Sequence, residues 1–292
     1  MIDVGPLPDR FSAADLAAVA APLQAVPTRF QVYFGDDVDE IAAEIEEVPD
    51  WRANTTVATD RGELVGWVIA EHDDEVGRIW WWGPVVEPSR DWTDVAAELL
   101  DAASARVGDR IEQFEFAVDA RHVDAIALAE RRGHRRFTGS VLLELDDLGG
   151  RAWSPPEAVD IGPLTDADAQ AVSRLHDELF PDTHLTSGQL VASHEDVLLA
   201  ARLDGSTIGY LRAEIQPGGN GYLDFLGVDD RHRGTGVGGA LVERAIVELA
   251  ARGAKTVSLT VREDNVAARA LYARLGFAGD RILVPLRLGF GA

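Results

Sequence analysis

The second half of the chain places apolar residues in a pattern that predicts strands and helices in a regular order. Two apolar runs, 197–203 and 206–215, meet at Asp204-Gly205 and are typical of a β-hairpin. Helices are predicted where apolar positions follow a helical period. These segments are 165–180, 236–253 and 264–276. Shorter apolar runs predict further strands at 159–163, 220–230, 255–261 and 281–288.

The ends of the predicted helices carry their own signals. Thr165 is a candidate N-cap, and Asp168 stands three residues later, where a capping box places an acid. Gly253 is expected to end the second helix, because glycine readily adopts the left-handed conformation that follows many helices. Local chemistry and hydrophobic period therefore predict the same boundaries.

The first half of the chain repeats this order of elements. Residues 55–74 match the hairpin, with Gly66-Trp67 opposite Gly209-Tyr210. The segment containing Trp80-Trp81-Trp82 matches the segment around Asp224 without a gap at an offset of 142, and 122–134 match 265–277 at an offset of 143. Three matches in one order at nearly one offset predict an internal duplication.

A linker is predicted between the two copies, at 146–157, where two glycines and two prolines follow an alternating apolar run. A chain of 292 residues, 46% of them hydrophobic, is long enough to bury two cores. The predicted domains are 1–148 and 158–292.

Composition excludes several functions. The absence of cysteine rules out disulfides, a thiolate nucleophile and a thiolate metal site. With no secretory pattern at the start and no apolar stretch of membrane-spanning length, we expect a cytoplasmic protein without a membrane partner. The net charge of −23 disfavours nucleic acid as a partner through long-range repulsion. That charge either attracts a cationic substrate or only keeps the surface solvated.

The segment from Val228 to Leu241 carries the strongest chemical signal. A strand ends there, a glycine-rich turn follows, and a helix begins. Glycines let the turn point several backbone N–H groups at one spot, and the helix N-terminus adds unpaired donors and partial positive charge. Such a turn is suited to a pyrophosphate, and Arg231 and Arg233 would add charge-assisted contacts.

Two other phosphate-binding motifs fit this segment poorly. Gly234, Gly236 and Gly239 have the spacing of a dinucleotide fingerprint, but they follow a hairpin late in the domain rather than a first βαβ unit. A P-loop would need Lys and Ser or Thr where Ala240 and Leu241 stand.

The segment resembles the GNAT N-acetyltransferase superfamily. The family's coenzyme motif, Arg/Gln-x-x-Gly-x-Gly/Ala, is matched by Arg233, Gly236 and Gly238. A second family motif is matched at five positions: Asn265, Ala268, Tyr272, Gly276 and Phe277. The resemblance implies an α/β fold of two tandem GNAT-like domains, each a mixed, mostly antiparallel sheet flanked by helices. It also implies an opening between the fourth and fifth strands that holds acetyl-CoA as co-substrate.

The resemblance assigns roles to residues of the second copy. Backbone groups of Leu226, Gly227 and Val228 would bind the pantetheine arm in the manner of an added strand. The pyrophosphate would bind at the turn, whose residues are Arg233, Gly234, Thr235, Gly236, Val237, Gly238 and Gly239. Asn265, which precedes Ala268 in the motif, would bind the pantetheine or cap the following helix. Tyr272 would protonate the departing thiolate, or else is a core aromatic.

A proton acceptor for the attacking amine is also needed. Asp224 lies on the strand that leads into the coenzyme turn and is the first candidate, with a structural salt bridge as the alternative. Alternation predicts that Leu223 and Phe225 face the other side of this strand. Glu214, His184 and His232 are weaker candidates, and we find no metal site in the sequence.

The first copy lacks this equipment and is predicted to be degenerate. Asp91, Trp92 and Asp94 stand where the second copy has Arg233, Gly234 and Gly236. His122 replaces the asparagine and Ala129 the tyrosine. The three consecutive tryptophans either fill the vacant opening or form an aromatic wall for a substrate.

The predicted function is transfer of an acetyl group from acetyl-CoA to a primary amine of a small molecule or peptide, through a ternary complex. The alternative class is a non-catalytic acyl-CoA-binding or regulatory module. Tandem members of the family that acetylate a mycothiol precursor suggest a cysteine-bearing aminoglycoside conjugate as an alternative acceptor. A monomer or a homodimer is expected.

Overall fold

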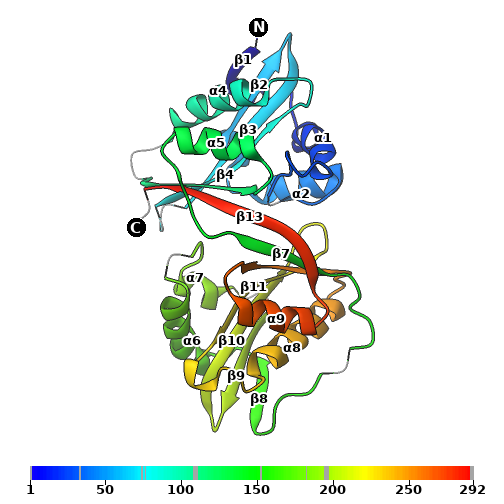
Figure 1. Cartoon of the computed structure of the whole chain (residues 1–292), viewed down its shortest axis with the longest axis vertical. Helices are drawn as coiled ribbons and strands as arrows, with labels where there is room; N and C mark the ends of the chain where they lie inside the picture. Colours follow the sequence, from blue (N-terminus) through cyan, green and yellow to red (C-terminus); the bar gives the residue numbers. More distant parts are fainter. Residues whose placement is uncertain are drawn as a thin grey trace. The chain divides into compact units, whose positions relative to one another are not determined.

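The computed structural model describes residues 2–32, 34–73, 75, 77–107, 111–151, 153–181, 183–193 and 197–289. The chain forms two compact units. Unit 1 contains residues 1–140 and 281–292, and unit 2 contains residues 141–280. The predicted mixed α/β fold is confirmed, because each unit has a mostly antiparallel sheet with helices on both faces (Figure 1).

Unit 2 follows the predicted order of elements, with one additional helix, α7, between α6 and β9. It contains β8 (Val159–Pro163), α6 (Asp166–Leu179), α7 (Ser187–Ala192), β9 (Val197–Leu203), β10 (Ser206–Ile215), β11 (Gly221–Val228), α8 (Val237–Ala251), β12 (Val257–Arg262) and α9 (Val266–Arg274). The strand order is β7-β12-β11-β10-β9-β8, where β7 is Ser140–Leu145. The predicted hairpin at Asp204-Gly205 joins β9 to β10, and Asp204 has the positive φ of 50° that a tight turn demands.

Unit 1 repeats the arrangement with a longer beginning. It contains β1 (Ile2–Pro6), α1 (Ala13–Gln24), α2 (Val38–Glu47), α3 (Trp51–Asn54), β2 (Thr55–Asp60), β3 (Glu63–Asp73), β4 (Arg78–Val86), α4 (Trp92–Ser104), β5 (Gln113–Asp119), α5 (Val123–Arg131) and β6 (Arg135–Arg136). The strand order is β1-β2-β3-β4-β5, followed by β13 (Ala278–Leu288). In both units the hairpin register shifts just before a matched glycine, Gly66 in one and Gly209 in the other.

Capping at the start of α6 agrees with the sequence. The Thr165 backbone N–H and hydroxyl both donate to Asp168 Oδ2, at 2.9 and 2.6 Å. Arg202 and Thr207 also donate to the same carboxylate, which is buried. These hydrogen bonds outweigh the cost of burial and hold the pKa of Asp168 below its usual value.

The last strand of each unit departs from the predicted domain ranges. Residues 141–145 of β7 belong to unit 2, and the residues of β13 from Arg281 onward belong to unit 1. Antiparallel pairing joins Leu283–Leu288 to Asp119–Phe114 of β5. Hydrophobic burial explains both placements, since Val141 and Leu143 enter the core of unit 2 and Val284 and Leu286 enter that of unit 1. The predicted domains, 1–148 and 158–292, therefore differ from the two compact units, which exchange the last strand of each predicted domain.

Candidate active site

The resemblance predicts an opening between the fourth and fifth strands of unit 2, which are β11 and β12 when β8 is counted as the first. Parallel pairing joins Gly221–Leu223 of β11 to Val257–Leu259 of β12 and stops there, before Leu226. On its other edge β11 stays paired with β10 up to Val228. The stretch Leu226–Val228, which we predicted to bind the pantetheine arm, therefore lies beyond the point where β12 stops pairing with β11.

The coenzyme turn has the conformation that its glycines predict. Gly234 and Gly236 have positive φ values of 77° and 94°, which a residue with a Cβ adopts only under strain. Gly236 is the N-cap of α8, and the first helical bond runs from Ala240 N–H to its carbonyl. The amides of 237–239 precede that bond, as the first amides of a helix do.

Three predicted parts of the coenzyme site meet at the start of α8. A Cβ placed on Gly238 would lie 3.7 Å from Val228 Cγ2 and 3.8 Å from both Leu226 Cδ2 and Leu271 Cδ2. A Cβ on Gly239 would lie 3.3 Å from Leu271 Cδ1. The helix N-terminus, the end of β11 and α9 are thus in side-chain contact range of one another.

Polar side chains of the turn make local contacts. Arg233 donates from Nε to the carbonyl of Val228 at 3.3 Å and forms an ion pair with exposed Asp230 at 2.8 Å. The Thr235 hydroxyl donates to the carbonyl of His232 at 2.7 Å. An exposed pair of this kind contributes little to stability, so Arg233 can exchange its partner for a phosphate at small cost.

The second family motif starts at the N-cap of α9 and continues along this helix. Asn265 is the N-cap, and its side-chain oxygen accepts from Ala268 N–H at 3.1 Å. The structure therefore bears out the capping interpretation of Asn265. A contact between Asn265 and pantetheine stays a prediction. Tyr272 is 8% exposed and its ring meets Phe277 edge-on at 5.7 Å. Burial raises the pKa of Tyr272 to about 12, so its hydroxyl keeps its proton near neutral pH.

Asp224 occupies a bulge in β11. Arg212 of β10 lies opposite Phe225, and the next residue, Ala213, lies opposite Leu223, so Asp224 is the extra residue. The prediction that Leu223 and Phe225 share a face is wrong for this reason. Leu223 packs into the core beneath α8, whereas Phe225 packs into the cluster beneath α6.

Asp224 belongs to a polar cluster with two of the three weaker candidates for the proton acceptor, Glu214 and His184. Arg212 donates from Nη1 to Asp224 Oδ2 and from Nη2 to Glu214 Oε2, the latter at 2.8 Å. His184 Nε2 lies 3.5 Å from Asp224 Oδ2, and its ring stacks on Phe225 at 5.2 Å. Partial desolvation opposes a charge on this half-exposed ring, but the hydrogen bond and charge of Asp224 raise the pKa of His184 above its usual value.

Sequence reasoning missed Arg212, which joins Asp224 to Glu214. Arg212 and Glu214 are two residues apart on one strand, so strand alternation places them on one face, and this was the available signal. His232, the last weaker candidate, lies 3.7 Å from Asp229 in the turn, apart from the described contacts of this cluster.

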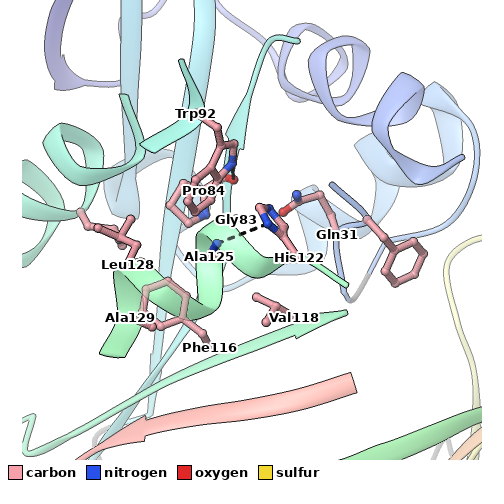
Figure 2. A pocket seen from close by; sticks show the side chains of 12 residues that line it. Gln31, Gly83, Pro84, Trp92, Phe116, Val118, His122, Ala125, Leu128 and Ala129 are labelled. Carbon is pink, nitrogen blue, oxygen red and sulfur yellow. Dashed lines mark hydrogen bonds between the residues drawn. The ribbon is translucent and has the colours of Figure 1, made fainter. Parts of the chain in front are cut away.

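The matching opening of unit 1 is filled by its own chain. Parallel pairing of β4 with β5 ends at Trp81 and Phe116, and Gln31 then forms an antiparallel bridge with Val118. We call the stretch from Gln31 to Gly35 the inserted segment. Gln24 holds it in place, because its side-chain amide donates to the carbonyls of Gln31, Phe34 and Gly35 at 2.9–3.2 Å. Only about 10 Å³ of cavity is left here, lined as Figure 2 shows by Gln31, Pro84, Trp92, Val118 and His122 among others.

Two substituted residues close the same opening further. Trp92 donates from Nε1 to the Pro84 carbonyl at 3.3 Å and meets the ring of His122 at 4.6 Å. Asp91 caps α4 by accepting from Asp94 N–H at 3.0 Å. The internal repeat matches this carboxylate and this indole with Arg233 and Gly234, and the structure places Asp91 as the N-cap of α4, as Gly236 is the N-cap of α8.

Two features that other functions would need are not found among the residues that the structure describes. No helix there is both long and apolar enough to cross a membrane. Nor do three or more His, Asp or Glu side chains of those residues converge in the manner of metal ligands.

Comparison with known proteins agrees with this geometry. A sequence profile of the "Acetyltransferase (GNAT) family" matches residues 166–277. The mycothiol acetyltransferase of Clavibacter michiganensis subsp. michiganensis is 30% identical over 222 residues, which are 70% of each chain. The N-alpha-acetyltransferase RimI of Mycobacterium tuberculosis is 36% identical over 128 residues, 41% of this chain and 79% of RimI.

A solved structure extends the likeness to the whole chain. A tandem GNAT protein from the clavulanic acid biosynthesis pathway superimposes with a TM-score of 0.70 at 16% identity and covers 100% of both chains. At this identity it shows the tandem fold and nothing about substrate. The chain therefore belongs to the GNAT family and is an acetyl-CoA-dependent acetyltransferase with two GNAT-like units.

Proposed function

We propose that unit 2 transfers the acetyl group of acetyl-CoA to a primary amine within a ternary complex. The observation that carries this proposal is the meeting of the glycine turn, the end of β11 and α9 beside an opening in the sheet. Acetyl-CoA would lie with its pyrophosphate at the amides of 237–239 and its pantetheine arm along Leu226–Val228. The acceptor would approach from the side of Asp224 and Glu214.

The proposed chemistry needs one proton acceptor and one proton donor. The neutral amine attacks the thioester carbonyl, a C–N bond forms, and the C–S bond breaks as the thiolate leaves. Tyr272 would give its proton to that thiolate, since its raised pKa keeps the hydroxyl protonated at neutral pH. The proton lost by the amine would pass to the pair formed by His184 and Asp224.

The ion pair with Arg212 supports a shared role for Asp224 and His184. The Asp224 carboxylate is already held by the Arg212 guanidinium, which leaves the proton of the amine to the neighbouring His184. The same carboxylate sits 3.5 Å from His184 Nε2, where it would orient the ring and stabilise the imidazolium. His184 is half-exposed, so an amine or a water could reach it.

The acidic surroundings favour an acceptor that carries a positive charge. Glu214 and Asp224 supply two carboxylates against the one guanidinium of Arg212. The two relatives named above point to two amine classes, a cysteine-bearing sugar conjugate of the mycothiol type and the N-terminal amine of a protein. We propose the small-molecule class first, because that relative matches across both units.

Release of free thiol from acetyl-CoA tests the proposal. The purified chain should release thiol with at least one member of a panel of cysteine-bearing aminoglycoside conjugates, simple aminoglycosides and N-terminal peptides. Mass spectrometry should find the acetyl group on nitrogen. Saturable acetyl-CoA binding without turnover on any amine of the panel would overturn amine acetylation.

A further inference from the structure

The segment predicted as a linker packs onto the helices of unit 2. Leu148 belongs to the unit 2 core, and Trp153 packs against that core from its edge. Arg151 donates from Nη1 to the carbonyl of Leu275, at the end of α9, at 2.9 Å. We call residues 151 and 153–156 the strap, because they lie against both α9 and α8.

The strap contacts both ends of the first turn of α8. Trp153 donates from its indole Nε1 to the carbonyl of Ala240 at 2.7 Å. Ala240 also closes this turn, since its N–H donates to the carbonyl of Gly236 at 3.0 Å. Pro156 flanks the other end, where a Cβ placed on Gly236 would lie 3.8 Å from the proline Cγ. The amides of 237–239, which we propose to bind the pyrophosphate, therefore lie between the two residues that the strap contacts.

A guanidinium keeps the indole of Trp153 in place. Arg244, one turn further along α8, has its Cζ 4.9 Å from the centre of the indole ring. The same guanidinium pairs with Glu248 on the same helix. A cation over an aromatic face is attracted to it, and the attraction grows where water is excluded. Two groups of α8 thus hold the indole, the carbonyl of Ala240 and the side chain of Arg244.

The residues of this first turn make it a weak start for a helix. Gly236 precedes the helix, and Gly238 and Gly239 are two of its first three residues. Glycine has the lowest helix propensity after proline, because it loses the most backbone freedom when it is ordered. The first turn also lacks part of the hydrogen bonding of a helix interior. A coenzyme that had to order this turn itself would lose affinity by the cost of ordering.

We propose that the strap preorganises the coenzyme turn, with Trp153 as a positioning residue that acts through Ala240. The inference rests on the proposed placement of the pyrophosphate at 237–239. It predicts that the strap sets the affinity for acetyl-CoA and leaves the chemical step unchanged, because the indole N–H is bonded to the turn.

Calorimetric titration of the whole chain with CoA tests the inference. Trp153→Phe removes the indole N–H and keeps an aromatic ring, so it should weaken CoA binding by about three- to tenfold, the effect of one hydrogen bond. In steady-state kinetics the KM for acetyl-CoA should rise in parallel, while kcat and the KM for the amine stay unchanged. Arg244→Gln, which removes the cation from the indole ring, should weaken CoA binding by about twofold.

Trp67→Phe is the matched control. It removes another indole N–H that donates to a helix carbonyl, that of Leu16 in α1 at 2.9 Å. Trp67 belongs to unit 1, so this variant should lower the stability of unit 1 and leave CoA affinity intact.

A second substitution distinguishes preorganisation from packing. Gly238→Ala raises the helix propensity of the turn, and the coenzyme motif accepts alanine at this position. The new Cβ would meet its neighbours at 3.7–3.8 Å, which are ordinary contacts. Added to Trp153→Phe, it should restore most of the lost CoA affinity. Without coenzyme, the Ala240 amide should exchange its hydrogen faster in Trp153→Phe than in the wild type, and more slowly again in the double variant.

The outcomes separate the strap from the coenzyme site. Circular dichroism of each variant should match the wild type. Unchanged CoA affinity of Trp153→Phe and Arg244→Gln, or a loss that Gly238→Ala does not restore, would overturn the inference. If Gly236→Asp weakens CoA binding while Trp153→Phe does not, the coenzyme site stands and the strap has no part in it. A wild-type chain that binds no CoA would overturn the proposed function together with the inference.

Discussion

In each unit the parallel pairing of two neighbouring strands stops early, at β11 and β12 in unit 2 and at β4 and β5 in unit 1. The two units differ in what lies beside that place. In unit 2 the turn beside it has two glycines with positive φ and presents the first amides of α8. In unit 1 a carboxylate caps α4, an indole binds the Pro84 carbonyl, and Gln31 bridges to β5. The internal repeat matches this region of unit 1 with the region where we propose that unit 2 binds the coenzyme. If unit 2 binds it there, the duplicated fold has kept its sheet while side chains of unit 1 fill the space that the ligand takes in unit 2.

The largest effect is expected at Tyr272, a residue that unit 1 has replaced by alanine at the matched position. Tyr272→Phe should lower turnover by roughly 10²–10⁴-fold and leave acetyl-CoA affinity nearly unchanged, because the hydroxyl acts on the leaving thiolate. Steady-state kinetics and calorimetry measure the two quantities.

Tyr210→Phe is the matched control, since it removes another buried tyrosine hydroxyl in unit 2, one that bonds to His176 at 2.8 Å. Full activity of Tyr272→Phe would mean that this ring serves packing alone.

Asp224→Asn should depress turnover by roughly 10²-fold at neutral pH. The loss should shrink as pH rises toward the pKa of the acceptor amine, because the amine then arrives without its proton. Removing the carboxylate also removes what raises the pKa of His184, so the acidic limb of the pH–rate profile should move to lower pH.

The turnover lost in Tyr272→Phe should not recover as pH rises. This difference between the two pH–rate profiles distinguishes the proton donor from the proton acceptor. An equal loss for Asp224→Asn at every pH would assign Asp224 to structure or to binding of the cation, and Glu214 would be the next acceptor to test.

Gly236→Asp should weaken CoA binding by about tenfold or more, because it brings to unit 2 the residue that unit 1 has at the matched position. The carboxylate would meet the pyrophosphate with like charge, and φ of 94° would strain any residue with a Cβ. Gly205→Asp places the same charge at another positive-φ glycine, in a hairpin turn, and should leave affinity intact.

Wild-type calorimetry should give one CoA per chain. A stoichiometry of two would mean that unit 1 binds coenzyme in spite of its filled opening, and unchanged affinity of Gly236→Asp would remove the pyrophosphate from this turn.

The smallest effect concerns the anchor of the inserted segment in unit 1. Glu44 of α2 accepts from Gly35 N–H at 2.8 Å, and burial raises the pKa of this carboxyl from 4.5 to about 7. Since the folded state holds this proton more tightly than the unfolded state, the stabilising contribution is complete below pH 4.5 and is lost as pH rises through 7. Glu44→Gln should therefore stabilise unit 1 by about 1–3 kcal/mol at pH 8 relative to pH 5.

Denaturant unfolding at the two pH values measures this difference, and Glu47→Gln on the same helix is the control. A pH-independent effect of Glu44→Gln would contradict a titrating carboxyl at this anchor.

Local rules predicted much of this protein from residues close in sequence. The Thr165–Asp168 capping box, the Asp204-Gly205 hairpin and the glycine turn each depend on a few neighbours and on backbone dihedrals, so the sequence determined them. The internal repeat likewise predicted two copies and identified which one had lost its glycines.

Tertiary structure alone decided the features that depend on distant partners. Asp224 became the extra residue of a bulge because β10 and β11 pair in a shifted register, and this turned Phe225 to the face opposite Leu223. Residues 281–288 joined unit 1 because β5 offered an unpaired edge and a core for Val284 and Leu286, which an apolar pattern cannot specify. Gln31 entered the opening of unit 1 through hydrogen bonds from Gln24, seven residues before it, whose side chain gave no sequence signal. Periodicity fixes which face of an element is apolar, but the choice of partner is a competition among all the surfaces that the folded chain brings together.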